Sequence, residues 1–508
     1  MKALGTINIG NLLKSSAWRY AGKEAIYDVD ADRRLSYTEL NERVNRLANG
    51  ILGLGGQKGD FVSILLYNCL ELAECYFAVS KSGTIAAPLV YRLSAREITG
   101  LINLSGSKTL IYDVKLKDKV IKQDLVNVRN FICVGGADEG ALEYDSLLKD
   151  CSPGEPPVDV FEEDNVYLNY TSGTTGLPKA YLLNHYNNAA AATYQFDLFG
   201  LTSRDVVATA FPAYGRVGFA WIMICVSKGC KNVIMNFEPR KFMEVVQREK
   251  VTFSNLVPTM AQMILTHPER SKYDFSSLRG IVYAAAPLPR VILENTWNNL
   301  CPNVFEYYGL QETAIMVLID PANKRLKPDS VGCPVPGVEM RIVDDRGNDV
   351  TRGEIGEIIM KGPAAMIGYY QQPDKTAETI KNGWFHSGDL GRLDEDNYLY
   401  IMGRKKDMII SGGQNIFAAE VEEALMAHPG VLDCAVIGLP DDFWGEKVTA
   451  VVVPREGLKL SEDEIVQHCR GSIAAFKTPK SVIFSDVVPR NPTGKILKFM
   501  LIEQYRQN

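Results

Sequence analysis

Residues 170–180 read YTSGTTGLPKA, which places glycines, hydroxyl side chains and one lysine directly behind an apolar segment at residues 165–170. Gly173 and Gly176 allow backbone with positive φ, so amide groups can approach an anion closely. Pro178 and its neighbour separate the second glycine from the lysine, unlike in a Walker A loop. The stretch therefore predicts a phosphate-binding loop, and the alternative is an ordinary polar loop. The side chains that could serve the anion are those of Thr171, Ser172, Thr174, Thr175 and Lys179.

Short apolar runs of strand length surround this loop on both sides. They alternate with helical segments such as residues 69–82, which are amphipathic. This alternation predicts parallel sheets covered by helices on both faces. The most apolar run, residues 217–226, is expected to be a buried strand or helix, because it has about half the length of a membrane-spanning helix. The expected strands are residues 61–66, 84–90, 109–113, 130–135, 232–235 and 280–286.

The pattern changes from residue 331 onward. Residues 338–362 read as hairpins with glycine-containing turns, which predicts a small antiparallel β unit. The charged run GRKKD then separates two apolar strands, and a helix is expected at residues 415–428. We therefore expect an α/β fold: a large N-terminal region of parallel and mixed sheets layered with helices, with a β subdomain, and then a small mobile α+β domain. The expected boundaries are residues 1–403 for the N-terminal domain, 404–407 for the hinge and 408–508 for the C-terminal lid.

With 508 residues, a formal net charge of −6 and 46% hydrophobic residues, the chain has the composition of a folded multidomain protein. The acidic balance argues against a broad nucleic-acid-binding surface. Five scattered histidines and ten cysteines without a CxxC pair predict neither a metal cluster nor a disulfide framework. We expect no export signal and no membrane span, and therefore a cytoplasmic protein. The oligomeric state stays open, with a homodimer as one option.

The phosphate loop and four later segments resemble the AMP-forming, adenylate-forming ligases, a family that includes acyl-CoA synthetases, amino-acid adenylation domains and luciferases. The five motifs follow the family order and span nearly the whole chain. The resemblance implies that ATP and a carboxylic acid form an acyl-adenylate and pyrophosphate, after which a thiol displaces AMP. The later segments are YYGLQET (307–313), GWFHSGDLG (383–391), GRKKDMIISGGQNIF (403–417) and PRNPTGKILK (489–498).

The resemblance also implies roles for individual residues around ATP. Glu312 matches a glutamate that helps to bind Mg²⁺, with Thr174 as a second metal contact. Gln311 stands where the family usually has a phosphate-contacting threonine, and its amide can still donate a hydrogen bond. Asp389 matches the ribose ligand, and Arg404 an arginine that contacts ribose or phosphate. Without that context, Glu312 would be an ordinary loop carboxylate and Asp389 a turn residue. The other expected ATP- and AMP-binding residues are Thr171, Ser172, Gly173, Thr174, Thr175, Gly176, Lys179, Ala285, Ala286, Pro287, Tyr308 and Thr313.

The C-terminal segment carries residues for both reaction steps. Lys495 resembles the adenylation lysine, which can bridge the acid carboxylate and the α-phosphate as charge grows between them. With Glu312 and Gln311 it makes up the expected catalytic set. Lys406 falls at the family's hinge position. The expected CoA-binding residues are the hairpin Ser411, Gly412, Gly413 and Gln414, together with Trp444 and Lys477; a packed aromatic and a surface lysine are the alternatives for the last two.

The acid is expected to bind beside Gly215, Arg216, Ala284, Tyr307 and Gly309. Gly309 occupies the position at which acetate-specific relatives have a tryptophan, so we expect room for larger acids, and Gly215 opens further volume. Arg216 either pairs with a second carboxylate on the substrate or lies on the surface. No aspartate in FPAYGRVGF is available for an α-amine. The expected substrate is a medium-chain, branched, alicyclic or aromatic monocarboxylate.

These residues predict a carboxylate–CoA ligase that uses ATP, Mg²⁺ and CoA, with a small acid as its other partner. The nearest rival is an adenylating enzyme with another acceptor, such as a carrier protein. A fatty-acyl-AMP ligase is disfavoured, because no insertion precedes GRKKD. A second rival is a silent nucleotide-binding homologue, which the unusual Gln311 and Gly215 keep open. The intact Lys179, Glu312 and Asp389, with Lys495, argue against that rival.

Overall fold

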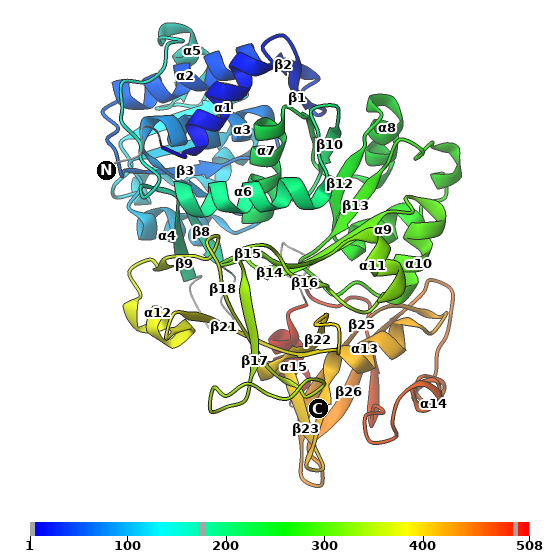
Figure 1. Cartoon of the computed structure of the whole chain (residues 1–508). Coiled ribbons are helices and arrows are strands. Elements are labelled where there is room, and N and C mark those ends of the chain that lie inside the picture. Colours follow the sequence, from blue (N-terminus) through cyan, green and yellow to red (C-terminus); the bar gives the residue numbers. More distant parts are fainter. Residues whose placement is uncertain (1–5, 172–178, 491–495, 507–508) are drawn as a thin grey trace.

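The structure is a computed structural model that describes residues 6–171, 179–490 and 496–506. The expected site residues Ser172, Gly173, Thr174, Thr175 and Gly176, as well as Lys495, lie outside the described residues. Figure 1 shows two large sheets with their helices in the first part of the chain, and two smaller sheets below them. The first two sheets form the frame of the molecule, so they are described first.

Sheet A has nine strands. Its six central strands, from β14 to β1, are parallel to one another. Such strands need cover on both faces, which explains their apolar sequences. The order is β16 (Cys333–Pro334), β15 (Ala314–Ile319), β14 (Val304–Leu310), β13 (Gly280–Tyr283), β12 (Phe253–Leu256), β10 (Val206–Thr209), β11 (Lys231–Ile234), β1 (Glu24–Asp28) and β2 (Arg33–Ser36).

Sheet B has eight strands, six of them parallel. The predicted phosphate loop joins β8 to β9, which pair as an antiparallel hairpin. Thr171 pairs with Lys179, so the two described ends of the loop lie side by side. The order is β19 (Gly368–Tyr369), β9 (Lys179–Asn184), β8 (Asn165–Thr171), β4 (Ile85–Pro88), β3 (Phe61–Leu65), β5 (Thr109–Asp113), β6 (Asn130–Val134) and β7 (Leu142–Glu143).

Helices fill the space between the two sheets. One apolar core joins side chains of α1, α2, α3 and α7 to strands β1 and β3. Every residue of α3 is buried, so the amphipathic interpretation of residues 69–82 was wrong: both faces of this helix meet protein. Serine capping boxes at Ser36 and Ser94 start α2 and α4. The helices here are α1 (Ile9–Arg19), α2 (Tyr37–Gly53), α3 (Leu70–Ser82), α5 (Tyr144–Asp150), α6 (His185–Phe199) and α7 (Arg216–Lys228), whereas α4 (Ala95–Ser105) packs on the other face of sheet B in a separate core.

The outer face of sheet A is covered by a second group of helices, which pack on their own apolar core. The run at residues 217–226 lies within the mostly buried helix α7 and is not a strand. Among the described residues, no helix combines the length and the apolar character that crossing a membrane requires. The helices of this group are α8 (Pro239–Glu249), α9 (Pro258–Leu265) and α10 (Arg290–Asn299). Two short helices lie elsewhere: α11 (Pro321–Leu326) packs beside β14, and α12 (Pro373–Thr379) packs against β19.

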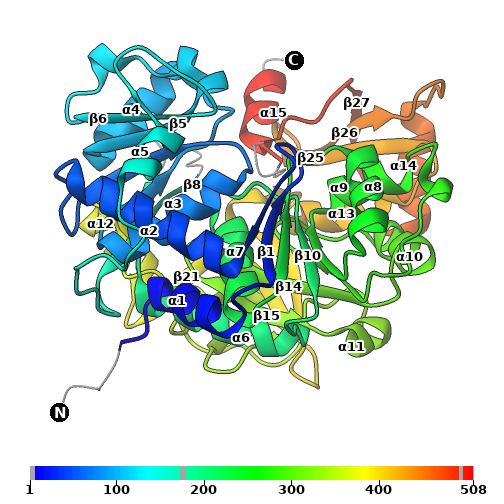
Figure 2. The same ribbon diagram turned by 90° about the horizontal axis from the view of Figure 1, so that it is seen from above.

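Two small sheets complete the molecule, and the short turn η4 (Lys405–Asp407) joins them. Sheet C is antiparallel, as the hairpin pattern predicted. Figure 2 shows the last part of the chain, coloured orange to red, on the opposite side of sheet A from α1. Sheet C contains β17 (Glu339–Val343), β18 (Gly356–Lys361), β20 (Ile380–Lys381), β21 (Trp384–Leu393) and β22 (Leu399–Arg404); sheet D contains β23 (Met408–Ser411), β24 (Gln414–Phe417), β25 (Val431–Asp441), β26 (Gly445–Pro454) and β27 (Ser481–Phe484).

Sheet D carries α13 (Ala418–Met426), α14 (Glu462–Ser472) and α15 (Lys498–Tyr505). The expected helix at residues 415–428 therefore begins later, at Ala418. Its first residues form β24 instead, because they pair with β23 across the glycine turn. The α/β fold with a small α+β C-terminal unit is confirmed.

Candidate functional site

A cavity of about 1330 Å³ is lined by residues from all four sheets. Its walls come from the loops after β10 and β13, the end of β14, the β21–β22 hairpin and α13. Several of these loops follow the carboxyl ends of parallel strands, where α/β sheets usually bind ligands. The first and last expected residues of the phosphate loop, Thr171 and Lys179, also line this cavity.

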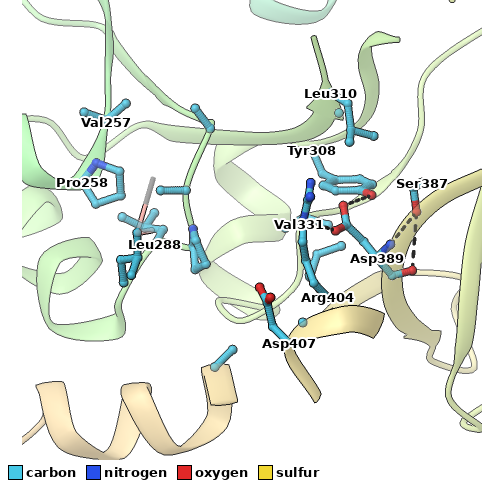
Figure 3. A pocket seen from close by; sticks show the side chains of 18 of the residues that line it. Val257, Pro258, Leu288, Tyr308, Leu310, Val331, Ser387, Asp389, Arg404 and Asp407 are labelled. Carbon is cyan, nitrogen blue, oxygen red and sulfur yellow. Dashed lines mark hydrogen bonds and ion pairs between the residues drawn. The ribbon is translucent and has the colours of Figure 1, made fainter. Parts of the chain in front are cut away.

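Asp389 occupies the centre of a buried hydrogen-bond network on the β21–β22 hairpin (Figure 3). Its Oδ1 lies 2.9 Å from Nε of Arg404, its partner in the strand register. Its Oδ2 accepts a hydrogen bond of 2.8 Å from the hydroxyl of Tyr308. Burial raises the pKa of Tyr308, and the negative charge of Asp389 adds to this effect. Each carboxylate oxygen still has a free lone pair, so Asp389 can accept from two adjacent hydroxyls.

Glu312 lies in the turn after β14, with 9% of its surface exposed. Its Oε1 accepts a 3.0 Å hydrogen bond from the hydroxyl of Tyr369, and the Lys179 Nζ is 4.9 Å from the centre of that tyrosine ring. Within the described ranges, no group of three or more His, Cys, Asp or Glu side chains could hold a metal on its own. One carboxylate beside a phosphate loop fits Mg²⁺, which commonly takes most of its ligands from water and substrate phosphates.

Arg216 is the first residue of α7, and only 3% of its surface is exposed. Its guanidinium donates to the backbone carbonyls of Gln311, at 2.9 Å, and Ala364, at 2.5 Å. No carboxylate of the described residues lies within ion-pair distance, and burial lowers its pKa. The surface alternative for Arg216 was therefore wrong. The side chain ties the Gln311 turn to the loop that precedes β19, while it also lines the cavity.

The two glycines of the expected acyl pocket differ in what surrounds them. A Cβ on Gly309 would lie 1.8 Å from the carbonyl oxygen of Ala314, because a register shift brings β14 and β15 very close there. The expectation that this glycine opens the pocket was wrong: its missing side chain makes room for β15. A Cβ on Gly215 would meet its nearest atom, Gln311 Nε2, at 3.7 Å. Gly215 therefore leaves usable space inside the cavity.

These surroundings predict opposite results for two alanine variants. We expect Gly309→Ala to destabilise the fold by about 2–3 kcal/mol, since β14 and β15 must move apart. Gly215→Ala has room and an ordinary φ of −87°, so its cost stays within about 1 kcal/mol. Thermal unfolding of both variants beside the wild type measures the difference. Equal midpoints for the two variants would contradict this account of Gly309.

The other expected residues on the N-terminal side divide into lining and supporting groups. Ala285, Ala286, Pro287 and Tyr307 line the cavity. Ala285 has a φ of 70°, a left-handed backbone conformation that favours glycine. Two expected residues lie behind the wall: Ala284 is buried, and Thr313 accepts a hydrogen bond from the Leu310 amide.

The C-terminal unit contributes its own part of the lining. Arg490 and Ile496 pair as an antiparallel bridge and both face the cavity, and Lys495 directly precedes Ile496. Lys406 also lines the cavity. Burial is the main cause that lowers its pKa, and the positive charges of Arg404 and Lys179 act in the same direction.

The expected CoA-binding residues do not line the cavity. Gly412 and Gly413 form the turn between β23 and β24, with φ of 57° and 76°. The Trp444 ring lies against Gly412, and Lys477 pairs with Glu420 at 2.5 Å. These residues therefore gather on the C-terminal unit, away from the Asp389 network. The hairpin consists of Ser411, Gly412, Gly413 and Gln414.

Sequence reasoning missed three residues of the site: Asn169, Tyr181 and Tyr369. All three line the cavity or contact residues that do. Strand alternation could have indicated Asn169, which precedes Thr171 by two residues and shares its face of β8. Tyr369 carries no local signal, because its place beside Glu312 depends on the pairing of β19 with β9.

Comparisons with known proteins show the family of the chain. The family model described as AMP-binding enzyme matches residues 13–370, and the AMP-binding enzyme C-terminal domain matches residues 420–495. A feruloyl-CoA synthase from Amycolatopsis sp is 37% identical, with 91% of this chain and 92% of the relative covered. The fatty acid–[acyl-carrier-protein] ligase ScoC from Streptomyces coeruleorubidus is 33% identical, with 93% and 92% covered. The crystal structure of the anthranilate CoA ligase AuaEII with anthranoyl-AMP superimposes with a TM-score of 0.94 and 26% identity, covering 100% and 99%.

Proposed function

The chain belongs to the AMP-binding enzyme family and is an acid–thiol ligase, and we propose that its reaction joins an aromatic, alicyclic or medium-chain monocarboxylate to CoA. ATP is cleaved to AMP and pyrophosphate in the reaction. The observation that carries this proposal is the cavity that holds Lys179, Glu312 and Asp389 beside the space left by Gly215. No hydrolytic nucleophile is needed, because the acyl-adenylate itself provides a good leaving group.

Each charged side chain has a task in binding ATP. Asp389 accepts hydrogen bonds from the two ribose hydroxyls through the lone pairs that Arg404 and Tyr308 leave free. Lys179 and the phosphate loop hold the phosphates. Glu312 would hold Mg²⁺ with those phosphates, and the ion, when bound, offsets the negative charge of the triphosphate.

The first step joins the acid to AMP. A carboxylate oxygen attacks the α-phosphorus, a new O–P bond forms, and the bond to the β-phosphate oxygen breaks so that pyrophosphate leaves. Lys495 lowers the barrier because its ammonium can contact both the carboxylate and the α-phosphate. In the second step the CoA sulfur attacks the acyl carbon, a C–S bond forms, AMP leaves, and the thiol proton passes to solvent.

The two steps need different parts of the C-terminal unit. We propose a domain of residues 1–403, a hinge at 404–407 and a lid of residues 408–508 that turns about Lys406. Arg490 and Ile496 line the cavity while the Gly412–Gly413 turn lies away from it, which supports an arrangement set for the first step. Turning the lid would exchange Lys495 for the glycine turn, whose lack of side chains suits a narrow thiol passage.

The class of the acid substrate is proposed from the apolar wall of the cavity beside Gly215. That wall contains no carboxylate that could take an α-amine, and Trp221 and Ile315 add flat or branched surfaces. Feruloyl-CoA synthase and the anthranilate CoA ligase are both named for aromatic acids, which supports the same class. The wall residues are Val217, Ala220, Trp221, Val257 and Ile315.

A carrier protein is the second candidate acceptor, because ScoC is named as a ligase of that kind. The place of action is proposed to be the cytoplasm. All ten cysteines are free thiols, most of them buried, which suits a reducing compartment.

Pyrophosphate release over a panel of acids, with free CoA or holo-carrier protein, tests the proposal. We expect one class of aromatic or medium-chain acids to give release that depends on CoA, with acyl-CoA as product. Acyl transfer to the carrier but not to CoA would move the function to the second candidate. Bound ATP without release for any acid would refute the ligase.

A further inference from the structure

The side chain of Gln311 is held by three donors that converge on one atom. Its Oε1 accepts hydrogen bonds from Asn169 Nδ2 at 2.9 Å, from the Tyr181 hydroxyl at 3.3 Å and from the Arg216 amide at 3.4 Å. Asn169 and Tyr181 are 4% and 0% exposed. An amide atom that is surrounded by three hydrogen-bond donors must be the oxygen. These contacts therefore fix the positions of Oε1 and Nε2 in the Gln311 amide.

The orientation of Asn169 is itself determined by the backbone. The Tyr170 amide donates to Asn169 Oδ1 at 2.9 Å, so the Asn169 NH₂ group must face the other way, toward Gln311. That NH₂ group also donates to the Tyr181 oxygen at 3.1 Å, which leaves the Tyr181 proton for Gln311. A chain of hydrogen bonds therefore runs from the backbone of β8 to the amide of Gln311.

The opposite end of the Gln311 amide faces the cavity. Nε2 donates to none of the described residues. It points toward Gly215, where an added Cβ would lie 3.7 Å from it. The buried guanidinium of Arg216 lies behind the same turn without a carboxylate partner among the described residues. A group bound here meets donors and positive charge, which favours an anionic oxygen.

Resting on the proposed function and on the donor role that the resemblance implies for Gln311, we propose that Asn169 and Tyr181 are positioning residues, which set the orientation of the Gln311 amide so that Nε2 donates to an anionic oxygen at the reacting centre. Both the carboxylate of the acid and the α-phosphate of ATP provide such an oxygen. Gln311 contacts the reacting atoms directly. Asn169 and Tyr181 act only through it.

Two nearly isosteric substitutions separate these roles. Gln311→Met removes the donor. Asn169→Asp keeps the acceptor for the Tyr170 amide but removes the NH₂ group, so the Gln311 amide turns over and presents its oxygen to the cavity. Asn165→Asp adds the same charge on the same strand, about 13 Å away, and is the matched control.

We expect Gln311→Met to lower the rate of pyrophosphate formation about 100-fold, as for the loss of one oriented donor. Asn169→Asp alone should lower this rate by about the same factor. When Gln311 is already Met, the added Asn169→Asp substitution should change the rate by no more than about threefold. Asn165→Asp should leave the rate within about threefold of the wild-type rate. A rate for Gln311→Met close to wild type would overturn the role of Gln311. An equal loss from Asn169→Asp in both backgrounds would overturn its positioning role.

Two further readouts identify the oxygen and separate this proposal from the ligase function. A raised KM for the acid assigns the carboxylate, whereas weakened AMP binding with an unchanged KM for the acid assigns the α-phosphate. If wild type releases no pyrophosphate, the ligase function fails alone. Titration with benzoyl sulfamoyl adenosine, whose acyl carbonyl and sulfonyl oxygens stand in for those of the carboxylate and the α-phosphate, then decides: about tenfold weaker binding by Gln311→Met supports the donor, and equal binding refutes it.

Discussion

Replacing Lys495 by alanine is expected to lower the rate of acyl-adenylate formation by about 10³-fold. The first step brings a carboxylate against a phosphate, and charge grows between them. Arg490 and Ile496, the described residues on either side of residues 491–495, both face the cavity. Lys495 directly precedes Ile496 in the sequence, and we propose that its ammonium supplies the cation for this step. Transfer of the acyl group from a preformed adenylate to CoA should stay within about threefold of wild type, because this step needs no cation at the phosphate.

Single-turnover measurements of the two half-reactions test this split. Lys498→Ala is the matched control, since Lys498 also lines the cavity but pairs with Glu422 at 2.7 Å. Its loss should change either step by less than about fivefold. Equal losses in both half-reactions for Lys495→Ala would mean that the variant disturbs the lid rather than the chemistry.

Much of the fold could be predicted from short-range patterns. Strands such as β3 and β5 are continuous apolar runs because both their faces are covered, and such runs are visible in any sequence. The end of β22 and the turn η4 coincide with the charged run GRKKD, which joins the two small sheets. The start of α13 was misplaced because β24 exists only through its pairing with β23.

The candidate site was less accessible to sequence reasoning, since its key contacts join distant segments. Gly309 was expected to widen the pocket, but only the register between β14 and β15 reveals that its missing Cβ accommodates Ala314. Arg216 carries a charge that usually lies in water, and its burial depends on carbonyls nearly 100 and 150 residues away in the sequence. Asn169 bonds to Gln311 across 142 residues. Motif spacing is blind to such pairs.

Asp389→Asn is expected to raise the KM for ATP about 100-fold, because two hydrogen bonds from ribose hydroxyls to a charged acceptor become weaker or are lost. The amide has nearly the shape of the carboxylate, so the β21–β22 hairpin should persist. Alanine is a poorer test, since it would leave Arg404 and the Tyr308 hydroxyl without their buried partner and cost about 3 kcal/mol of stability.

Deoxy analogues of ATP show whether the loss arises at the ribose. Wild type should use 2′-deoxy-ATP and 3′-deoxy-ATP much less well than ATP, whereas Asp389→Asn should treat the three nucleotides almost alike. Asp394→Asn is the matched control, since Asp394 follows β21 directly but bonds to Lys327 at 2.6 Å outside the cavity. If Asp389→Asn keeps the full preference for ATP, its carboxylate does not bind the ribose hydroxyls. Its network with Arg404 and Tyr308 would then serve to join sheets A and C beside the nucleotide rather than to hold it.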